Sequence, residues 1–456
     1  MTALVWFRND LRSLDHPALS AAAARGQCRA VYLLCPQQLD EHIIAPIRRH
    51  YLRRALNALA VQLAELGIPF DIIDAGDFQA VPAALARYCE QHDISEVFAH
   101  EELLVDERRR DEACQQALNI PLTLLDDCLV HPQRVLKDDG DPYKVFTPYS
   151  RRARSLLQSA PPRCQRRPKA IGPALSPTEC PVFGDEKDSS DWLADEEGAL
   201  QQLRNFCRER ADAYREQRDF PAETGTSKLS AALALGLLSP RQCLARLQAE
   251  AGDSIWDPKS NPGTWLNELL WRSFYHQVAF HFPRVVMGRA FQPETEVIAW
   301  GNNPELFAAW QEGRTGYPIV DAGMRQLAET GWMHNRLRMI TASFLCKHLH
   351  IDWRWGERHF LQQLIDADFA SNNGGWQWAA STGTDAAPYF RIFNPTTQSQ
   401  RFDAQGRFIR HYVPELATLS NKTIHQPGAT GTYPAPIVDH RASRETTLAL
   451  FQEIRD

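Results

Sequence analysis

The chain has 456 residues, of which 44% are hydrophobic, and a formal net charge of −6 at pH 7. A chain of this length can bury a large core and is expected to form two or three domains. No apolar run approaches the length of a membrane span, which excludes an integral membrane protein. The acidic balance argues against indiscriminate binding to nucleic acid, although local basic patches can still hold phosphate.

Residues 1–130 alternate short apolar runs with amphipathic segments, such as the predicted helix over residues 48–66. This pattern predicts an α/β domain, an open parallel sheet of Rossmann-like type covered by helices. No GxGxxG motif is present, so nothing in the motif pattern supports a dinucleotide site in this part. The predicted strands are Leu4 to Phe7, Ala30 to Leu34, Phe70 to Ile73, Glu96 to Ala99 and Leu122 to Leu125.

The N-terminal residues predict a buried strand at once, and they do not have the pattern of a signal peptide. Ten cysteines are scattered without a CxxC pair, so neither a zinc site nor a disulfide framework is indicated. We therefore expect a reducing cytoplasm and no metal site.

Residues 131–195 are rich in proline, serine and charge, which is typical of a long connection on the surface. Beyond this stretch the periodicity is helical, including an apolar helical run over residues 231–238. We therefore predict a large all-helical domain over residues 196–456.

Tryptophans are concentrated in one stretch of the C-terminal half, where nine of the twelve lie between residues 265 and 378. Core packing is the ordinary role of an indole, but it can also stack on a flat ligand or lose an electron. Trp376 and Trp378 stand two positions apart, so on a helix they point in different directions and cannot share one buried face. Trp353 and Trp355 repeat this spacing.

Two further segments group polar and aromatic residues. Residues 225–230 (Gly-Thr-Ser-Lys-Leu-Ser) precede a helical run and offer hydroxyls and free amides, as a phosphate site or an ordinary capped helix would. On predicted helices, two sets of residues each share one face at i, i+3 and i+4 spacing. The sets are Glu268, Trp271 and Arg272, and Asn335, Arg338 and Met339. For Glu268 with Arg272, a surface ion pair is the competing explanation.

Several long segments, from residue 5 to residue 395, are similar to those of the class I cyclobutane pyrimidine dimer (CPD) DNA photolyases of the photolyase and cryptochrome family. They are Val5-Trp6-Phe7-Arg8-Asn9-Asp10-Leu11-Arg12, Arg218-Asp219-Phe220-Pro221, Gly316-Tyr317-Pro318-Ile319-Val320-Asp321-Ala322, Gly331-Trp332-Met333-His334-Asn335-Arg336 and Arg391-Ile392-Phe393-Asn394-Pro395. The resemblance implies a helical domain that binds FAD, and light-driven electron transfer from reduced FAD to a pyrimidine dimer that then splits.

The resemblance also implies which residues bind FAD. The segment 226–230 would take the pyrophosphate, and Asn372 would face the reactive nitrogen of the flavin. Arg338 would balance a carboxylate in the polar frame of the ring. The implied FAD-binding residues are Tyr214, Thr226, Ser227, Lys228, Leu229, Ser230, Arg272, Arg338, Asp366, Asp368 and Asn372.

By the same resemblance, Trp300, Trp353 and Trp376 form a chain that carries electrons to oxidised flavin. Trp271 and Trp378 would be walls of the dimer pocket, with Asn335 and Met339 lining it. Glu268 would hydrogen-bond the dimer, and a protonated carboxyl in a dry pocket would stabilise the developing negative charge.

The implied partner is single- or double-stranded DNA that contains pyrimidine dimers, bound by a monomer. Arginine suits phosphate because its fork binds two oxygens at once. Extrusion of the lesion is part of the family's general behaviour, and photolyases are themselves a standard example of base flipping. The implied DNA-binding residues are Arg218, Arg336, Arg391 and Gln398.

Members of the family often carry an antenna chromophore, either methenyltetrahydrofolate or a deazaflavin, in the N-terminal domain. The folate pattern has Asn-Glu where this chain has Asp106 and Glu107, and a lysine where it has Met287. The lost cation and added carboxylate are expected to weaken a site for an anionic folate. We therefore expect loosely bound folate, another antenna, or none.

Three alternatives remain open. A cryptochrome-type blue-light photoreceptor would share the fold and the flavin, but the chain shows no signalling tail after Phe451, and Asn372, Glu268 and Met339 favour repair. An enzyme for the pyrimidine-pyrimidone lesion would place two histidines at the pocket, where His334 stands alone. A light-independent flavin oxidoreductase would need a nicotinamide site, for which no motif is visible.

Overall fold

The computed structural model describes residues 2–454, which belong to two compact units. Each unit is formed by several segments of the chain. Unit 1 comprises Met1–Asp212, Ser227–Pro283 and Ile365–Asp368, and unit 2 comprises Ala213–Thr226, Arg284–Leu364 and Phe369–Asp456. The boundaries predicted near residues 130 and 195 stay predictions.

Unit 1 contains the predicted parallel sheet. Its strand order is β3-β2-β1-β4-β5, and all neighbouring strands are parallel. Every predicted strand lies within an observed one, which confirms the fold class of this part. The strands are β1 (Thr2–Phe7), β2 (Gln27–Leu34), β3 (Phe70–Asp74), β4 (Ile94–His100) and β5 (Leu122–Leu125).

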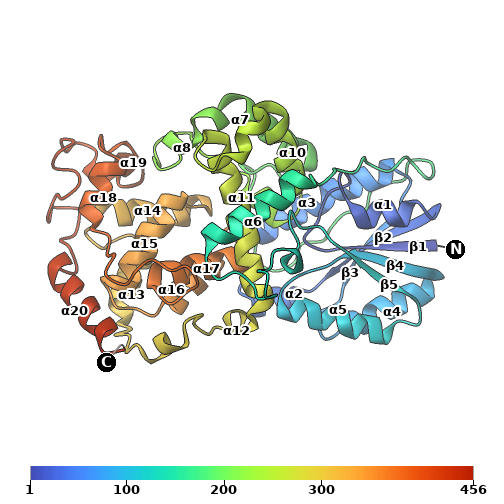
Figure 1. Cartoon of the computed structure of the whole chain (residues 1–456), viewed down its shortest axis with the longest axis horizontal. Helices are drawn as coiled ribbons and strands as arrows, with labels where there is room; N and C mark the ends of the chain where they lie inside the picture. Colours follow the sequence, from blue (N-terminus) through green and yellow to red (C-terminus); the bar gives the residue numbers. More distant parts are fainter. Residues whose placement is uncertain (1, 455–456) are drawn as a thin grey trace. The chain divides into compact units, whose positions relative to one another are not determined.

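Helices cover both faces of this sheet, as Figure 1 shows: α1 and α3 lie on one face, and α4 and α5 lie on the other. Leu4 and Trp6 alternate with Val5 along β1, and they belong to the buried cluster that includes Leu85 of α4. Both faces of the central strand are therefore buried, which explains its continuous apolar sequence. The helices are α1 (Pro17–Ala23), α2 (Pro36–Glu41), α3 (Pro46–Glu65), α4 (Val81–Gln91) and α5 (Val105–Ala117).

The remainder of unit 1 is helical. The stretch 131–195 contains α6 (Phe146–Ser159), which the sequence pattern did not predict and which packs on α11. Its buried positions, such as Tyr149 and Ala153, recur at helical spacing beneath a mainly polar sequence. The other elements of unit 1 are η1 (Pro132–Arg134), α7 (Glu196–Glu209), α9 (Ser230–Ala234), α10 (Pro240–Ala251), η3 (Gly252–Trp256) and α11 (Asn261–His281).

Unit 2 is helical, as predicted for this part of the sequence. Helices α14 and α15 pack together, and α15 and α16 both pack against α17. Its elements are α8 (Tyr214–Gln217), η4 (Pro293–Val297), α13 (Pro304–Gln311), α14 (Pro318–Thr330), α15 (Asn335–Lys347), α16 (Trp353–Leu361), α17 (Phe369–Ala380), α18 (Pro395–Phe402), α19 (Arg407–Tyr412), η5 (Pro414–Leu416) and α20 (His440–Gln452). The short elements η2 (Ala211–Ala213) and α12 (Pro283–Val286) each span a sequence boundary between the units.

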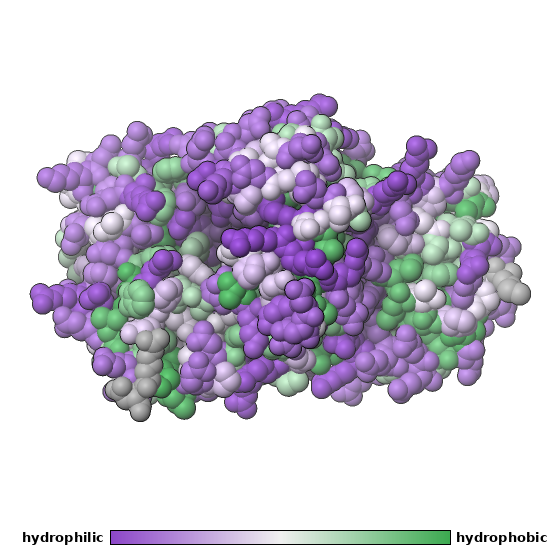
Figure 2. All heavy atoms as spheres, viewed as in Figure 1, coloured by the Kyte–Doolittle hydropathy of each residue, from purple (hydrophilic) through white to green (hydrophobic). Residues whose placement is uncertain are grey.

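The surface of the protein is mainly hydrophilic, as expected when most apolar side chains are buried in the cores of the two units. Figure 2 shows a face on which hydrophilic side chains predominate and hydrophobic ones lie among them in small groups. No helix within residues 2–454 is both long enough and apolar enough to cross a membrane.

A buried ionic network in unit 1 joins the loop after β1 to the segment before α10. Arg12 is fully buried and donates to the carbonyl oxygens of Asp15 (2.8 Å) and Gly236 (3.1 Å). It also forms an ion pair with Asp127. The Asp127 carboxylate forms a second ion pair with the guanidinium of Arg241 at 2.7 Å. Arg241 in turn lies 3.1 Å from a carboxylate oxygen of Asp15. The buried charges are thus paired, as burial requires.

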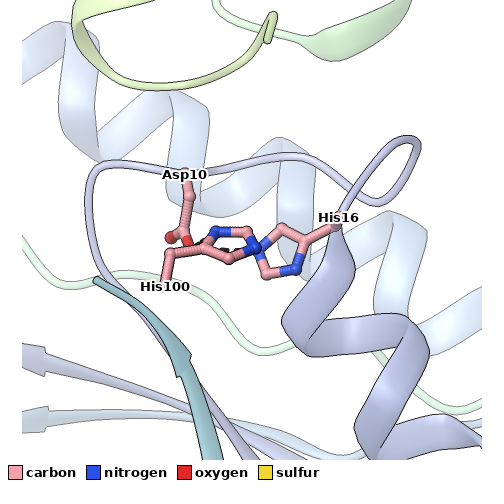
Figure 3. A group of neighbouring side chains, drawn as sticks. All are labelled: Asp10, His16 and His100. Atoms are coloured by element: carbon pink, nitrogen blue, oxygen red, sulfur yellow. Dashed lines mark ion pairs between the residues drawn. The ribbon is translucent and has the colours of Figure 1, made fainter. Parts of the chain in front are cut away.

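A second buried cluster lies beside this network, where Figure 3 shows His16 and His100 converging on Asp10. His16 Nε2 and His100 Nδ1 lie 3.0 and 2.7 Å from Asp10 Oδ2. The opposite ring nitrogens accept from backbone amides, His16 Nδ1 from Leu19 and His100 Nε2 from Ala18. Each neutral imidazole must therefore carry its proton on the nitrogen that faces Asp10.

These tautomers distinguish the cluster from a metal site, although the three groups are as close as metal ligands can be. A metal-bound histidine has a lone pair on the ligating nitrogen and normally a proton on the other. Here the backbone amides occupy the side where that proton would be. Burial, assisted by His100, lowers the pKa of His16 to about 4. Burial alone would raise the pKa of Asp10, but the two imidazoles outweigh it and hold that pKa well below its usual range.

Acid is expected to destabilise unit 1 through this cluster. Between about pH 6.5 and pH 4 the unfolded chain binds a proton at residue 16 that the folded chain does not, so the free energy of unfolding falls on the order of 1 kcal/mol per pH unit for this group. The variant His16→Asn should show a shallower slope in urea unfolding measured across this range. The exposed change His411→Asn is the control, and equal slopes for wild type and His16→Asn would contradict the assignment.

The close approach of Gly236 to the loop after β1 generates a second prediction. Its φ is +65°, and a Cβ would lie 2.2 Å from the carbonyl oxygen of Asn9. Gly236→Ala should therefore lower the free energy of unfolding by more than about 2 kcal/mol in urea titration. Gly26 also has a positive φ, of +96°, but nothing within 4 Å, so Gly26→Ala should cost only about 1 kcal/mol. Equal losses would show that the contact with Asn9 is unimportant.

Candidate active site

Helix α11 places the first set of predicted site residues in unit 1. The helix begins after Ser260, whose hydroxyl accepts from the amide of Gly263 at 2.9 Å, as a helix cap does. Glu268, Trp271 and Arg272 follow on one face, and all three are half-buried beside the fully buried face that carries Phe274. The helical spacing inferred from the sequence is therefore correct.

Trp271 is held by an aromatic partner from α6. The rings of Trp271 and Phe146 are 3.7 Å apart between centres and 8° from parallel, and Tyr275 packs at 5.4 Å from the indole. This stack fixes the plane of an indole that the sequence suggested as a wall of a pocket. Phe146 was missed because it lies in the stretch interpreted as a connection.

Asp368 in unit 1 contacts two basic side chains of this helix face. Its carboxylate lies 2.8 Å from His276 and 3.5 Å from Arg272, both on α11. Asp366 is buried, and its charge and that of Asp368 act on Arg48 of α3, whose pKa is lowered by burial and partly restored by these carboxylates. His276 and Arg48 were not among the predicted residues. His276 follows Arg272 by one turn, a spacing that could have identified it.

The segment Thr226–Ser230 changes units along its length, because Thr226 belongs to unit 2 and Ser227–Ser230 to unit 1. Lys228 has a φ of +51°, a conformation that a residue with a side chain rarely adopts. Gln202 of α7 donates to the carbonyl oxygens of Ser227 (2.8 Å) and Lys228 (3.0 Å), which restrains the backbone of this loop. Helix α9 is shorter than the predicted 231–238, because Gly236 takes a positive φ there.

Helix α15 carries the second predicted set, in unit 2. His334 caps its start by accepting from the amide of Arg336 at 3.1 Å, and burial lowers the pKa of His334 to about 4. Asn335 is exposed at the first turn, while Arg338 and Met339 are half-buried. The Nε of Arg338 donates to the carbonyl oxygen of Met333 at 2.8 Å, which directs its guanidinium.

Asn372 on α17 is oriented by α16. Its Nδ2 donates to the backbone carbonyl of Glu357 at 3.1 Å, which fixes which end of the amide is turned away from α16. The Glu357 side chain accepts from Asn373 Nδ2 at 2.8 Å, and burial raises the pKa of Glu357 to about 7. Glu357 was missed, because only the packing of α16 on α17 brings it to Asn372.

The two indoles of α17 occupy different environments, as their spacing predicted. Trp376 is 2% exposed, whereas Trp378 is half-buried. Gly356 on α16 lies so close to Trp376 that a Cβ there would be 2.1 Å from the indole Cη2. Trp353 is buried one turn before Gly356, and Trp300 is half-buried after η4, so all the tryptophans assigned to electron transfer lie in unit 2.

The predicted DNA-binding residues all lie in unit 2. Asp219 links two of them, at 2.7 Å from Arg336 and 3.9 Å from Arg218. The Arg336 guanidinium also lies over the ring of Phe402, 4.4 Å from its centre. The other two are Arg391, which is exposed, and Gln398, which is half-buried on α18.

The residues considered for an antenna lie on α5 of unit 1. Asp106 is exposed and pairs with Arg109 at 3.7 Å. Burial and the nearby Glu102 raise the pKa of Glu107 to about 7. Met287, where the folate pattern has a lysine, belongs to unit 2 and is 57% exposed.

Comparisons with known proteins agree over nearly the whole chain. Residues 3–169 match the DNA photolyase family, and residues 265–453 match the FAD binding domain of DNA photolyase. The deoxyribodipyrimidine photo-lyase of Salmonella typhimurium is 46% identical over 100% of this chain and 99% of its own length, and that of Escherichia coli is 45% identical over the same shares.

Solved structures show the same fold. A bacterial class III photolyase from Agrobacterium tumefaciens has a TM-score of 0.84 and 33% identity over 99% of this chain and 97% of its own. A cryptochrome from Synechocystis has a TM-score of 0.86 and 30% identity over 98% of this chain and 99% of its own. Full-length identity of this order, together with both family matches, shows that the chain belongs to the DNA photolyase family within the photolyases and cryptochromes.

Proposed function

We propose that the chain is a deoxyribodipyrimidine photo-lyase that uses light to split cyclobutane pyrimidine dimers in DNA. The observation that carries this proposal is the 46% identity with the Salmonella enzyme over both full lengths. The similar cryptochrome structure shows only that the fold also serves proteins of another name. The fold therefore does not distinguish a repair enzyme from a photoreceptor, whereas the side chains expected for repair, such as Asn372, Glu268 and Met339, favour the enzyme.

The polar groups near the predicted flavin residues fit FAD. Asp366 and Asp368 supply carboxylates, Arg272 and Arg338 supply cations, and the amides of segment 226–230 suit a pyrophosphate. Lys228 holds a strained backbone, which is a feature often found at binding loops. Bound reduced FAD would supply the photoexcited electron. Tyr214, Asn372 and the residues of segment 226–230 would bind and orient it.

The dimer would be held by two further groups of residues. Glu268 would hydrogen-bond a carbonyl of the dimer and stabilise the negative charge that arrives with the electron. Trp271, backed by Phe146, offers a rigid flat surface for stacking. By the resemblance to the photolyases, Asn335, Met339 and Trp378 would also contact the dimer.

Damaged DNA would be positioned by Arg218, Arg336, Arg391 and Gln398. The contact of Asp219 with Arg218 and Arg336 restrains both guanidiniums before phosphate arrives, which reduces the entropy lost on binding. Trp300, Trp353 and Trp376 would carry electrons to oxidised flavin. We also propose that the protein is a monomer of the cytoplasm, which its ten free thiols support.

The antenna remains the least defined part of the proposal. Asp106 would place a carboxylate where the folate pattern has the amide of an asparagine, and Met287 would supply no cation where that pattern has a lysine. We therefore propose that methenyltetrahydrofolate binds loosely, or that a deazaflavin or no antenna is used. Stoichiometric folate retained through gel filtration of the purified protein would contradict weak binding.

The proposed function predicts light-dependent repair. Purified, photoreduced protein should remove the dimer from a thymine-dimer oligonucleotide under blue light but not in the dark. Glu268→Gln should lower repair per absorbed photon by about fivefold, because a neutral amide donor loses on the order of 1 kcal/mol of stabilisation. The exposed change Glu445→Gln is the control. Absence of repair by protein that contains FAD would favour the photoreceptor instead.

The tight contact of Gly356 with Trp376 gives a prediction for photoreduction. Gly356→Ala should displace the indole and destabilise unit 2 by about 1–3 kcal/mol through overpacking. Photoreduction of oxidised flavin should slow, while repair by chemically reduced protein should change little. Trp376→Phe, active only after chemical reduction, is the reference. Unchanged photoreduction in Gly356→Ala would show that the position of Trp376 is not critical.

A further inference from the structure

Trp376 stands at the inner end of a line of aromatic rings that the proposed relay does not use. Its indole lies 6.0 Å from Trp310 between ring centres, edge to face. Trp310 stacks on Phe307 at 5.8 Å, and Phe307 meets Trp355 at 5.2 Å. All four rings belong to unit 2, on α17, α13 and α16. This line therefore runs from Trp376 to Trp355 by ring contacts alone.

Solvent exposure changes along this line. Trp310 is 0% exposed and Trp376 is 2% exposed, whereas Trp355 is 37% exposed. A positive charge left on an indole by electron loss is stabilised by water and is costly in a buried site. The charge would therefore move outward to Trp355. Phe307, which is harder to oxidise than indole, would act as a bridge between the two tryptophans.

Trp355 also lies in a place that a charged molecule can reach. It lines a surface hollow of about 380 Å³ together with Phe307, Gln311, Arg354, Arg358 and Gln362. Arg354 is paired with Glu296 at 2.7 Å and with Asp352 at 3.1 Å. Arg358 is exposed and forms no ion pair within residues 2–454. An uncompensated guanidinium beside the exposed indole attracts anions.

We propose that Trp355 is a second surface site of electron uptake for photoreduction of the flavin, served by a small thiol whose carboxylate groups bind beside Arg358. The proposal rests on the proposed function, because it requires bound flavin. It adds Trp310 and Trp355 to the residues that supply electrons to Trp376, in parallel with Trp353 and Trp300.

Each electron transfer along the line of rings reduces one group and oxidises the next group outward. With oxidised flavin bound and photoexcited, Trp376 would give it one electron, Trp310 would refill Trp376, and Trp355 would refill Trp310 across Phe307. The oxidised Trp355 indole releases its N–H proton to water. The thiolate then gives one electron to Trp355, which takes a proton back, and two oxidised thiols combine as a disulfide. The net change is one electron gained by the flavin for each thiolate oxidised.

The test measures photoreduction of oxidised flavin under anaerobic blue light with glutathione as the reductant. In Trp353→Phe protein the relay through Trp353 and Trp300 is broken. Photoreduction should nevertheless be faster than in Trp376→Phe protein, whose rate measures direct reduction of the flavin by the thiol. Adding Trp355→Phe to Trp353→Phe should lower the rate at least tenfold. Adding Trp256→Phe, a half-buried tryptophan in unit 1, is the matched control and should leave the rate unchanged.

Charge provides a second readout. In the Trp353→Phe background, Arg358→Glu should raise the glutathione concentration needed for half-maximal rate severalfold, with little change for neutral 2-mercaptoethanol. Equal rates for Trp353→Phe with and without Trp355→Phe would overturn the proposal, as would a Trp353→Phe rate no higher than that of Trp376→Phe. Dimer repair by the same proteins after dithionite reduction reports the proposed function separately. Loss of repair and of FAD in the wild type would overturn both.

Discussion

The buried guanidinium of Arg12 is the constraint on which the arrangement of unit 1 depends. A fully buried cation is tolerated only if carboxylates and carbonyl oxygens surround it, and here they come from the loop after β1, from Asp127 and from Gly236. The same set of contacts restrains the chain that leaves segment 226–230. The loop that follows the first strand of the sheet is therefore joined to the chain that leaves the segment proposed to bind the cofactor.

Unit 2 depends on close packing rather than on charge. Gly356 allows α16 to approach the ring of Trp376, and this approach also brings the Glu357 carbonyl within hydrogen-bond reach of Asn372. The packing of these two helices thus determines the positions of both Trp376, a proposed electron carrier, and Asn372, a proposed neighbour of the flavin. A larger residue at position 356 would disturb the two together, because packed interiors yield as a unit.

Much of the fold could be predicted from the periodicity of apolar residues in the sequence, whereas less of the candidate site could be predicted in this way. The strands were predictable because parallel strands buried on both faces leave uninterrupted apolar runs, as in Leu4 to Phe7. Glu268, Trp271 and Arg272 were placed on one face by helical spacing alone. Helix α6 was missed because the proline, serine and charge around it outweigh its narrow apolar stripe. The partners Phe146, Glu357 and Asp219 were not predictable, since their roles arise from contacts between segments far apart in the sequence.

The indole nitrogen of Trp376 has a consequence of its own. It is buried and has no hydrogen-bond acceptor within residues 2–454. An indole that loses an electron there has no protein acceptor for its proton among the described residues, so we expect it to stay a charged radical that is refilled without proton movement. Replacing water by heavy water should therefore leave this inner step unaltered, and isotope sensitivity should arise only where an oxidised ring meets solvent. The interior of the protein would carry electrons alone, and proton chemistry would be confined to its surface.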